Sequence, residues 1–225
     1  MRQLFCEDTG FVCDKNELFT RLNHREDLFE RACELLEELQ GEIRPCYIAR
    51  ELPVTVNQSD RFSIEDEVFR SKIAALKLSE QKNAFVFIAS SGRGVDDRLD
   101  KEEDPLDKSL IDIIAYMAYL KASTAMSAAL EAEYGMQRHL RLCPGSIIDW
   151  SVGDNRFFFP LLDGLWQPLN LRVLDSGLIV PLKSSAGVLY ETTDEFESCA
   201  ICPRPNCPSR TLPFDLDLHE QMGNL

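Results

Sequence analysis

The stretch IIAYMAYLKASTAMSAALEAEYGMQ, residues 113–137, decides most of what the sequence says about the fold. Together with the residues from Asp107 onward, it is rich in Ala, Leu, Met and Glu and contains neither Pro nor Gly until Gly135. These residue types favour the interior of a helix, and glycine is common just past a helix C-terminus. The sequence therefore predicts one long helix that begins near Asp107.

The segments before this helix predict further helices and several strands. Residues 15–39 carry apolar side chains at three- and four-residue intervals, which is typical of an amphipathic helix, with a break near Asn23. Residues 43–56 alternate and include two prolines, which favours short strands near a sheet edge. We also predict a helix over residues 63–78, whose first turn is acidic, and a buried strand over residues 84–92.

The residues after Gly135 change in character. Residues 169–191, LNLRVLDSGLIVPLKSSAGVLYE, are strand-like with turn signals, and the end of the chain combines prolines and cysteines without an amphipathic period. The regular βα alternation of a doubly wound sheet is missing. We therefore predict an α+β fold with a mixed, mostly antiparallel sheet flanked by helices and an irregular cysteine-containing C-terminal tail. The predicted divisions are an N-terminal helical segment (1–42), the main domain (43–192) and the tail (193–225).

Composition and charge limit the partners. The 225 residues include 24 Lys and Arg against 38 Asp and Glu, for a formal net charge of −14. A field of this sign opposes binding to nucleic acid or anionic lipid. The longest apolar run, residues 109–120, contains Asp112 and is shorter than the roughly 20 residues that span a bilayer. Because the first ten residues show no targeting pattern, we expect a cytoplasmic protein that binds neither nucleic acid nor a membrane.

Several catalytic motifs do not occur in the sequence. His24, His139 and His219 lack the spacing of paired metal ligands on a helix, and neither G-x-S-x-G nor G-x-G-x-x-G is present. We therefore expect no histidine metal centre, no serine hydrolase and no nucleotide site built on a glycine loop.

Three cysteines give the strongest local signal. Cys199, Cys202 and Cys207 are separated by two and then four residues within a proline-rich segment. Thiolates this close can bind zinc or an iron–sulfur cluster. A fourth ligand could be Cys143, Cys46 or another residue brought close by folding. The alternative is that all three are reduced surface thiols.

A second signal is RLCPGS, residues 141–146, directly after the long helix. An arginine in a rigid Pro-Gly turn suits a carboxylate, and Gly145 permits a close approach of the backbone to a ligand. Glu131, ten residues before Arg141, could pair with an amino group. Without further context the same residues also fit a surface salt bridge and a turn.

Five blocks of sequence together resemble the activation domain of cobalamin-dependent methionine synthase. They are RLCPGSIIDW from Arg141, a Phe- and Leu-rich segment that ends in LLDG at Gly164, LDSGLIVPLKSSAG (174–187), STAMSAALE (123–131) and FIASSGRGVDDRL (87–99). The resemblance covers about residues 46–187. It implies a domain that binds S-adenosylmethionine and docks over a corrinoid carried by another domain or protein, so that inactive cob(II)alamin is reduced and remethylated.

The resemblance also assigns ligand residues. It places the arginine that binds the ligand at Arg141, a backbone contact at Cys143 and the turn glycine at Gly145. Glu131 takes the position of the carboxylate that binds the amino group. The family's tyrosine after the glycine is Ser146 here, which removes an aromatic surface that a sulfonium or adenine could use.

The resemblance leaves open how this chain would act on a corrinoid. The chain has no D-x-H-x-x-G motif to supply a cobalt-ligating histidine, so we expect it to act in trans on a corrinoid-binding methyltransferase or corrinoid protein, as an accessory component of methyl transfer. A reductase or flavodoxin is a further expected partner. The alternatives are an iron–sulfur redox protein that delivers electrons to a corrinoid protein, and a non-catalytic module that binds one.

Overall fold

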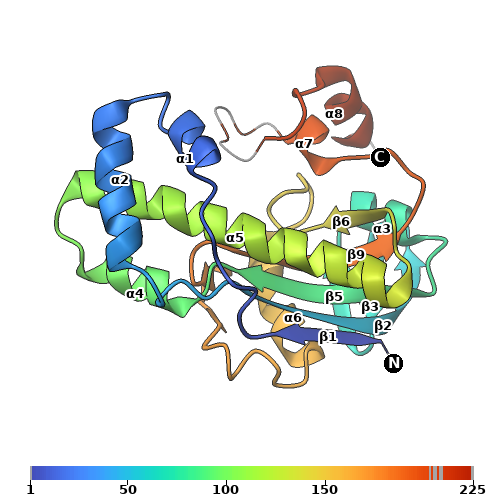
Figure 1. Ribbon diagram of the computed structural model, residues 1–225. Coiled ribbons are helices and arrows are strands. Elements are labelled where there is room, and N and C mark those ends of the chain that lie inside the picture. Colours follow the sequence, from blue (N-terminus) through green and yellow to red (C-terminus); the bar gives the residue numbers. More distant parts are fainter. Residues whose placement is uncertain (1, 203, 205–206, 208–209, 224–225) are drawn as a thin grey trace.

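The computed structural model describes residues 2–202, 204, 207 and 210–223, and Figure 1 shows the arrangement of its elements. In chain order they are β1 (Gln3–Cys6), α1 (Lys15–Arg21), α2 (Glu26–Glu38), β2 (Cys46–Gln58), β3 (Arg61–Ile64), β4 (Glu67–Arg70), α3 (Lys72–Leu78), β5 (Asn83–Ser90), α4 (Arg93–Lys101), α5 (Pro105–Tyr134), β6 (His139–Leu142), the 3-10 helix η1 (Val152–Asp154), α6 (Asn155–Leu161), β7 (Arg172–Val173), β8 (Ile179–Val180), β9 (Ser184–Glu191), α7 (Ser198–Ile201) and α8 (Leu216–Gly223).

One antiparallel sheet organises the molecule. Its strands follow the order β4-β3-β2-β5-β9-β6, and β1 pairs with β2 beside this path. Successive side chains of a strand point to opposite faces. On β5, Phe85 and Phe87 pack toward α5, whereas Val86 and Ile88 lie in the core with α3 and α6. The predicted α+β class, with a mostly antiparallel sheet flanked by helices, is confirmed.

Helix α5 is the long helix predicted from the sequence. The Asp104 carboxylate accepts two backbone N–H bonds of its first turn, Pro105 is its first residue, and Gly135 ends it with a left-handed φ of 72°. By length and composition alone α5 could cross a membrane, although we expected no such helix. In this fold it lies along the sheet, and Met126 and Leu130 are buried against the strands, as in a core helix.

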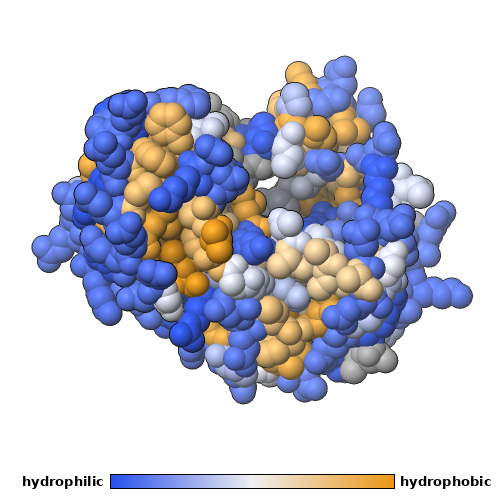
Figure 2. All heavy atoms as spheres, in the orientation of Figure 1, coloured by the Kyte–Doolittle hydropathy of each residue, from blue (hydrophilic) through white to orange (hydrophobic). Residues whose placement is uncertain are grey.

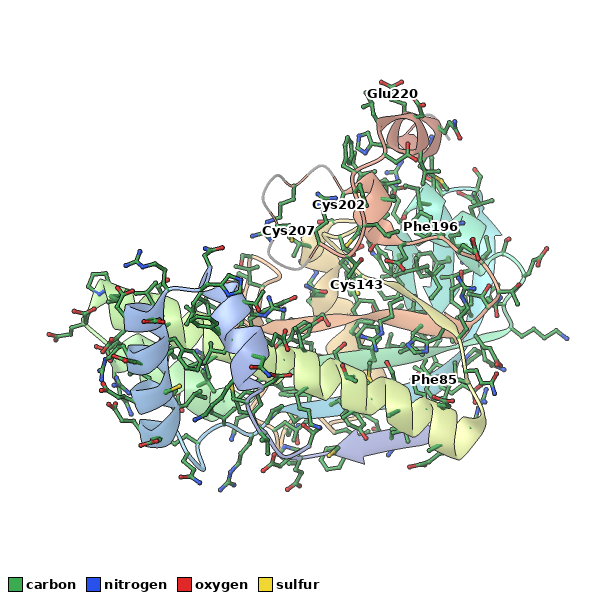
Figure 3. The ribbon with its side chains drawn as sticks, turned by 45° about the horizontal axis from the view of Figure 1, so that its top comes forward. Phe85, Cys143, Phe196, Cys202, Cys207 and Glu220 are labelled. Atoms are coloured by element: carbon green, nitrogen blue, oxygen red, sulfur yellow. The ribbon has the colours of Figure 1, made fainter. Side chains whose placement is uncertain are left out.

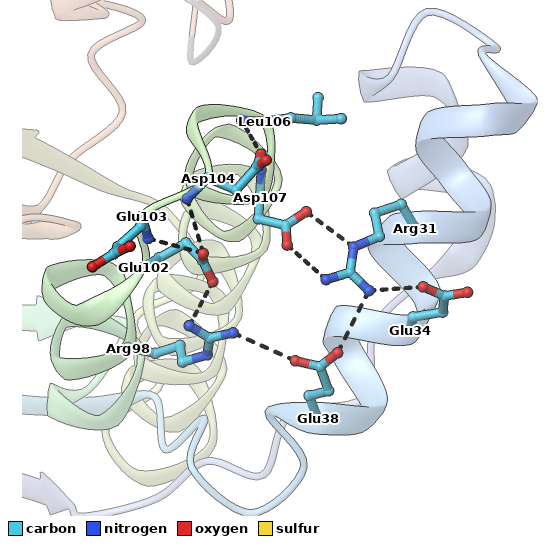
Figure 4. A network of polar contacts seen from close by, with 9 residues as sticks. All are labelled: Arg31, Glu34, Glu38, Arg98, Glu102, Glu103, Asp104, Leu106 and Asp107. Carbon is cyan, nitrogen blue, oxygen red and sulfur yellow. Dashed lines mark hydrogen bonds and ion pairs between the residues drawn. The ribbon is translucent and has the colours of Figure 1, made fainter.

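A network of charged side chains ties helix α2 to α5 (Figure 4). Arg31 on α2 donates hydrogen bonds of 3.0 and 2.6 Å to the Asp107 carboxylate on α5 and also contacts Glu34 and Glu38. The Arg31 guanidinium holds the pKa of Asp107 below its usual value. Because β1 pairs with β2, residues 1–42, which were predicted to be helical, also contribute a strand to the sheet.

The predicted helix over residues 63–78 is wrong in its first half. Residues 61–70 form the β3–β4 hairpin, whose turn places Glu65 at a φ of 48°. Phe62 and Ile64 are buried, and burial of every second residue is the period of a strand rather than of a helix. Helix α3 begins only after Ser71, so the acidic residues belong to the hairpin turn.

The C-terminal tail is not irregular throughout. Helices α7 and α8 lie beyond the edge strand β6 (Figure 1). Phe196 and Ile201 are buried in the same hydrophobic cluster as Val86 and Ile88 of β5. The tail therefore packs on the main core.

Candidate functional site

Arg141 lies on β6, at the edge of the sheet, and its side chain turns toward α5. Its guanidinium donates hydrogen bonds to the hydroxyls of Ser123 and Ser127 and, at 3.0 Å, to the carbonyl oxygen of Ser123. The two serines are four residues apart and share one face of the helix. The guanidinium carbon also lies 5.7 Å from the centre of the Phe87 ring. Strand and helix together hold Arg141 in one orientation.

No carboxylate among the described residues balances this guanidinium. Its hydrogen-bond partners are two hydroxyls and one carbonyl, all of them neutral. Burial lowers the pKa of Arg141, but an arginine keeps its charge at neutral pH. A buried charge without an opposite charge is costly. An anion bound beside Arg141 would offset that cost.

The backbone of β6 offers free hydrogen-bonding groups beside Arg141. The Thr192 N–H donates to the Arg138 carbonyl at 3.2 Å, and the register therefore joins Leu140 to β9 by backbone hydrogen bonds. In an antiparallel pair the residues between such positions turn their N–H and C=O groups away from the partner strand. The N–H groups of Arg141 and Cys143 thus point toward the open edge of the sheet.

A cavity of about 250 Å³ lies at this open edge. Residues 138–141 form one wall, and the tail segment 194–199 forms the other. Figure 3 shows this arrangement from above, with Phe196 and Cys202 on the tail and Cys143 near the end of β6. Three acidic residues of the tail line this cavity, Asp194, Glu195 and Glu197, and of these Glu195 lies 3.7 Å from Arg138.

His139 lies beside Arg141 on the same face of β6. Its Nε2 is 3.3 Å from the Ser127 hydroxyl, and its buried Nδ1 has no partner among the described residues. Burial and the neighbouring Arg141 charge lower the pKa of His139 to about 4. His139 is therefore neutral at pH 7 and adds no positive charge to the cavity.

Acidification is expected to destabilise the fold through His139. Between pH 6.5 and about pH 4 the unfolded state binds a proton that the folded state does not, so the free energy of unfolding falls as the pH falls. Because His139 is partly exposed, we expect a loss of about 1 kcal/mol between pH 7 and pH 5. Urea denaturation should show a smaller loss for His139→Gln, which does not titrate. Equal losses in the two proteins would contradict this assignment.

The turn after Arg141 is closed by its own hydrogen bonds. The Ser146 N–H and hydroxyl both donate to the Cys143 carbonyl, at 3.1 and 2.7 Å. Gly145 has a left-handed φ of 77°, and its N–H donates to the Trp150 carbonyl at 2.8 Å. At this turn Gly145 and Ser146 shape the backbone next to Cys143, whose backbone contact to a ligand stays a prediction.

Glu131 lies on the same face of α5 as Ser123 and Ser127, one helical turn further along. Its side chain is exposed, and it does not line the cavity with Arg141. The structure thus places Glu131 in line with the serines that hold Arg141 without bringing it to the guanidinium. Its role as the amino-group ligand remains a prediction.

The three tail cysteines, Cys199, Cys202 and Cys207, are partly exposed. Within the described ranges, no group of three or more Cys, His, Asp or Glu side chains is placed to hold a metal ion. Burial raises the pKa of the Cys143 and Cys46 thiols, which we considered as a fourth ligand, to about 11 and about 12. Binding of zinc or an iron–sulfur cluster stays a prediction.

An arginine organises the backbone around these cysteines. The Arg210 guanidinium donates to the carbonyl oxygens of Cys199, Cys202 and Arg204 at 2.8, 2.9 and 2.7 Å. Hydrogen bonds to a charged donor are stronger than neutral ones. The described part of the tail is therefore held by contacts that need no metal.

A larger cavity, of about 770 Å³, lies between α1, α5 and the segment before β9, in the hollow that Figure 2 shows between the N-terminal helices and the tail. Tyr116 and Tyr119 line it, and Arg21 lies 4.7 Å over the Tyr116 ring. Lys183 and Asp112 form an ion pair of 2.8 Å within it. The charged side chains that line this larger cavity are largely paired with one another, whereas the guanidinium of Arg141 has no carboxylate partner among the described residues.

The sequence pointed to Arg141 but not to the residues that hold it. Ser123 and Ser127 could have been found from the sequence, because two serines four residues apart on an apolar helix share one face. His139 could not, since its position beside Arg141 depends on the register of β6. The acidic wall of the cavity was missed because the tail was interpreted as a cysteine loop.

Comparison with known proteins shows a similarity of fold to one solved structure described below. No protein-family model matches the sequence, and no curated protein matches it significantly. Among solved structures, the chain is similar to the crystal structure of the MetH reactivation domain bound to AdoHcy, with a TM-score of 0.64 and 13% sequence identity, over 87% of this chain and 79% of that one. The chain thus has an activation-domain-like fold. The predicted resemblance is confirmed at the level of the fold.

Proposed function

We propose that this chain binds S-adenosylmethionine or AdoHcy at the open edge of β6 and supports the reductive reactivation of a corrinoid methyltransferase. The observation that carries the proposal is the guanidinium of Arg141, which is partly buried, held by two serines and paired with no carboxylate among the described residues. A ligand with a free carboxylate supplies the missing charge. The fold of the MetH reactivation domain, whose crystal structure contains AdoHcy, supports this ligand class.

The groups at the edge suit an amino-acid ligand. Arg141 keeps two N–H donors for the carboxylate, one on Nε and one on Nη1, because both hydrogens of Nη2 already go to Ser123 and Ser127. The outward N–H of Cys143 can donate to the same end of the ligand. Glu131, on the solvent side of α5, would pair with the ammonium group. Neutral His139 adds no positive charge. Arg138 and Arg141 are the two cations that line the cavity, and Arg138 lies 3.7 Å from Glu195.

The partner in this proposal is a corrinoid held by another domain or another protein. The corrinoid would supply the cobalt, which takes one electron from a reductase or flavodoxin and then accepts the methyl group of S-adenosylmethionine, leaving AdoHcy. This chain's contribution is to bind and orient the methyl donor, which lowers the entropic cost of bringing the two reactants together.

Calorimetric titration of the full chain with AdoHcy tests the ligand assignment. A one-to-one complex is expected. The absence of binding at millimolar AdoHcy would overturn the proposed function.

A further inference from the structure

The residues around Arg141 account for only one end of the proposed ligand. AdoHcy joins an amino acid to adenosine, a neutral nucleoside with a flat aromatic base, and proteins hold such bases by stacking them on aromatic side chains. The turn after β6 carries Ser146, whose hydroxyl donates to the Cys143 carbonyl. Phe196, which lines the cavity beside Arg141, is only 8% exposed. The nucleoside therefore needs an aromatic surface from another element.

The larger cavity, between α1, α5 and residues 182–184, has such a surface. Its volume of about 770 Å³ lies within the roughly 300–1,000 Å³ of cavities that bind small molecules. Tyr116 and Tyr119 of α5 line it, with ring centres 6.1 Å apart, and both residues are partly exposed. Ile113, three residues before Tyr116, adds an apolar side chain. This combination suits the base and ribose of a nucleoside.

The charged side chains of this cavity favour a neutral group. Arg21 pairs with Glu17 at 2.7 Å, and Lys183 pairs with Asp112 at 2.8 Å. A charged part of a ligand would have to displace one of these partners, whereas a nucleoside would not. Arg21 also lies 4.7 Å over the Tyr116 ring, which limits the rotation of that ring.

Tyr119 connects this cavity to the Arg141 site. It lies one helical turn before Ser123, which holds the Arg141 guanidinium, on the same face of α5. Burial raises the pKa of Tyr119, while its 3.0 Å hydrogen bond with the Ser185 hydroxyl and the nearby charge of Arg141 act in the opposite direction. Tyr116 lies seven residues before Ser123, or about 10 Å along the helix axis. An extended AdoHcy molecule spans that distance.

We propose that the cavity lined by Tyr116 and Tyr119 binds the nucleoside of the ligand whose carboxylate binds Arg141. Successive turns of α5 then carry both the aromatic rings for the base and the serines that hold the arginine. A ligand that reaches both places gains affinity from each, so the protein selects an amino acid joined to a nucleoside over either part alone. This inference rests on the proposed function and adds the recognition of the nucleoside.

The first test removes one aromatic ring from the cavity. Tyr116→Leu should weaken the binding of adenosine and of AdoHcy to the full chain by the same factor, about fivefold or more, because a stacked base loses its platform. Tyr116→Phe keeps the ring and should restore the affinity. Tyr134→Leu is the matched control, because Tyr134 stacks on Phe85 near the other end of α5 and does not line this cavity. Unchanged affinities in Tyr116→Leu would overturn the nucleoside cavity.

Methionine as a ligand separates the two ends of the site, because it has the carboxylate and the ammonium group but no nucleoside. In NMR titrations, Arg141→Met should weaken methionine binding and leave adenosine binding unchanged, whereas Tyr116→Leu should do the reverse. If Tyr116→Leu weakens methionine and adenosine equally, the tyrosine acts on the fold of the whole site, and the nucleoside cavity is overturned.

Adenosine also separates this inference from the proposed function. If neither AdoHcy nor methionine binds the wild type, the proposed function fails. Adenosine binding that is present in the wild type and lost in Tyr116→Leu would still support a nucleoside cavity in that case. The absence of adenosine binding to the wild type at millimolar concentration would overturn it.

Discussion

Replacement of Arg141 by methionine is expected to lower the affinity for AdoHcy by about 10- to 150-fold while leaving the fold intact. The loss corresponds to the roughly 1.5–3 kcal/mol that a hydrogen bond to a charged group contributes. The free energy of unfolding should change by less than about 1 kcal/mol, because the lost charge is partly buried beside neutral partners only and methionine fills most of its volume. Calorimetry measures the first quantity and urea denaturation the second.

The two measurements together distinguish a ligand-binding arginine from a structural one. If Arg141 were only structural, its replacement would lower the free energy of unfolding of the protein, and binding would fall only because part of the protein is unfolded. Arg141→Lys is a useful companion variant, since it keeps the charge but not the planar guanidinium with its five donors, and an intermediate affinity is expected. If Arg141→Met binds AdoHcy as well as the wild type does, Arg141 does not hold the ligand.

Gly187→Ala is expected to lower the free energy of unfolding by about 2–4 kcal/mol in urea denaturation. Gly187 lies on β9 opposite Leu142 and Cys143, where a Cβ atom would stand 2.2 Å from the Leu142 carbonyl oxygen and 3.1 Å from the Cys143 Cα. Both are backbone atoms, so β6 would have to shift. That shift would also move Cys143, which carries the outward N–H of the proposed site.

Gly153→Ala is the matched control. Its added Cβ would meet only the Ser151 hydroxyl, at 3.3 Å, and a side chain can move aside more easily than a strand. We expect a change within about 1 kcal/mol of the wild type. If Gly187→Ala is as stable as this control, β6 and β9 do not approach as closely as described.

The sequence predicts those parts of the fold that depend on local signals. Helix α5 and strand β5 are long and uniform in composition, and Asp104 and Gly135 mark the ends of α5. The β3–β4 hairpin was missed because its turn needs Glu65 in the left-handed region, which glutamate rarely adopts. The acidic residues of that turn resemble the first turn of a helix.

The site shows the same division between local and non-local information. Arg141 stands out in the sequence because a Pro-Gly turn follows it, but its partners lie on α5 and depend on the packing of the helix against β6. The tail was predicted to need a metal because its prolines and cysteines are visible in the sequence. Its contacts through Phe196 and Arg210 depend on the core and on carbonyl groups, for which the sequence has no signal.

Parallel calorimetric titrations with AdoHcy and with adenosine test the central claim most directly, because adenosine lacks the carboxylate and the ammonium group. The account predicts that AdoHcy binds one-to-one and that adenosine binds at least about tenfold more weakly, since it makes no bond to Arg141. Equal affinities would show that the uncompensated guanidinium of Arg141 does not recognise the ligand. No binding of AdoHcy at millimolar concentration would contradict the account as a whole.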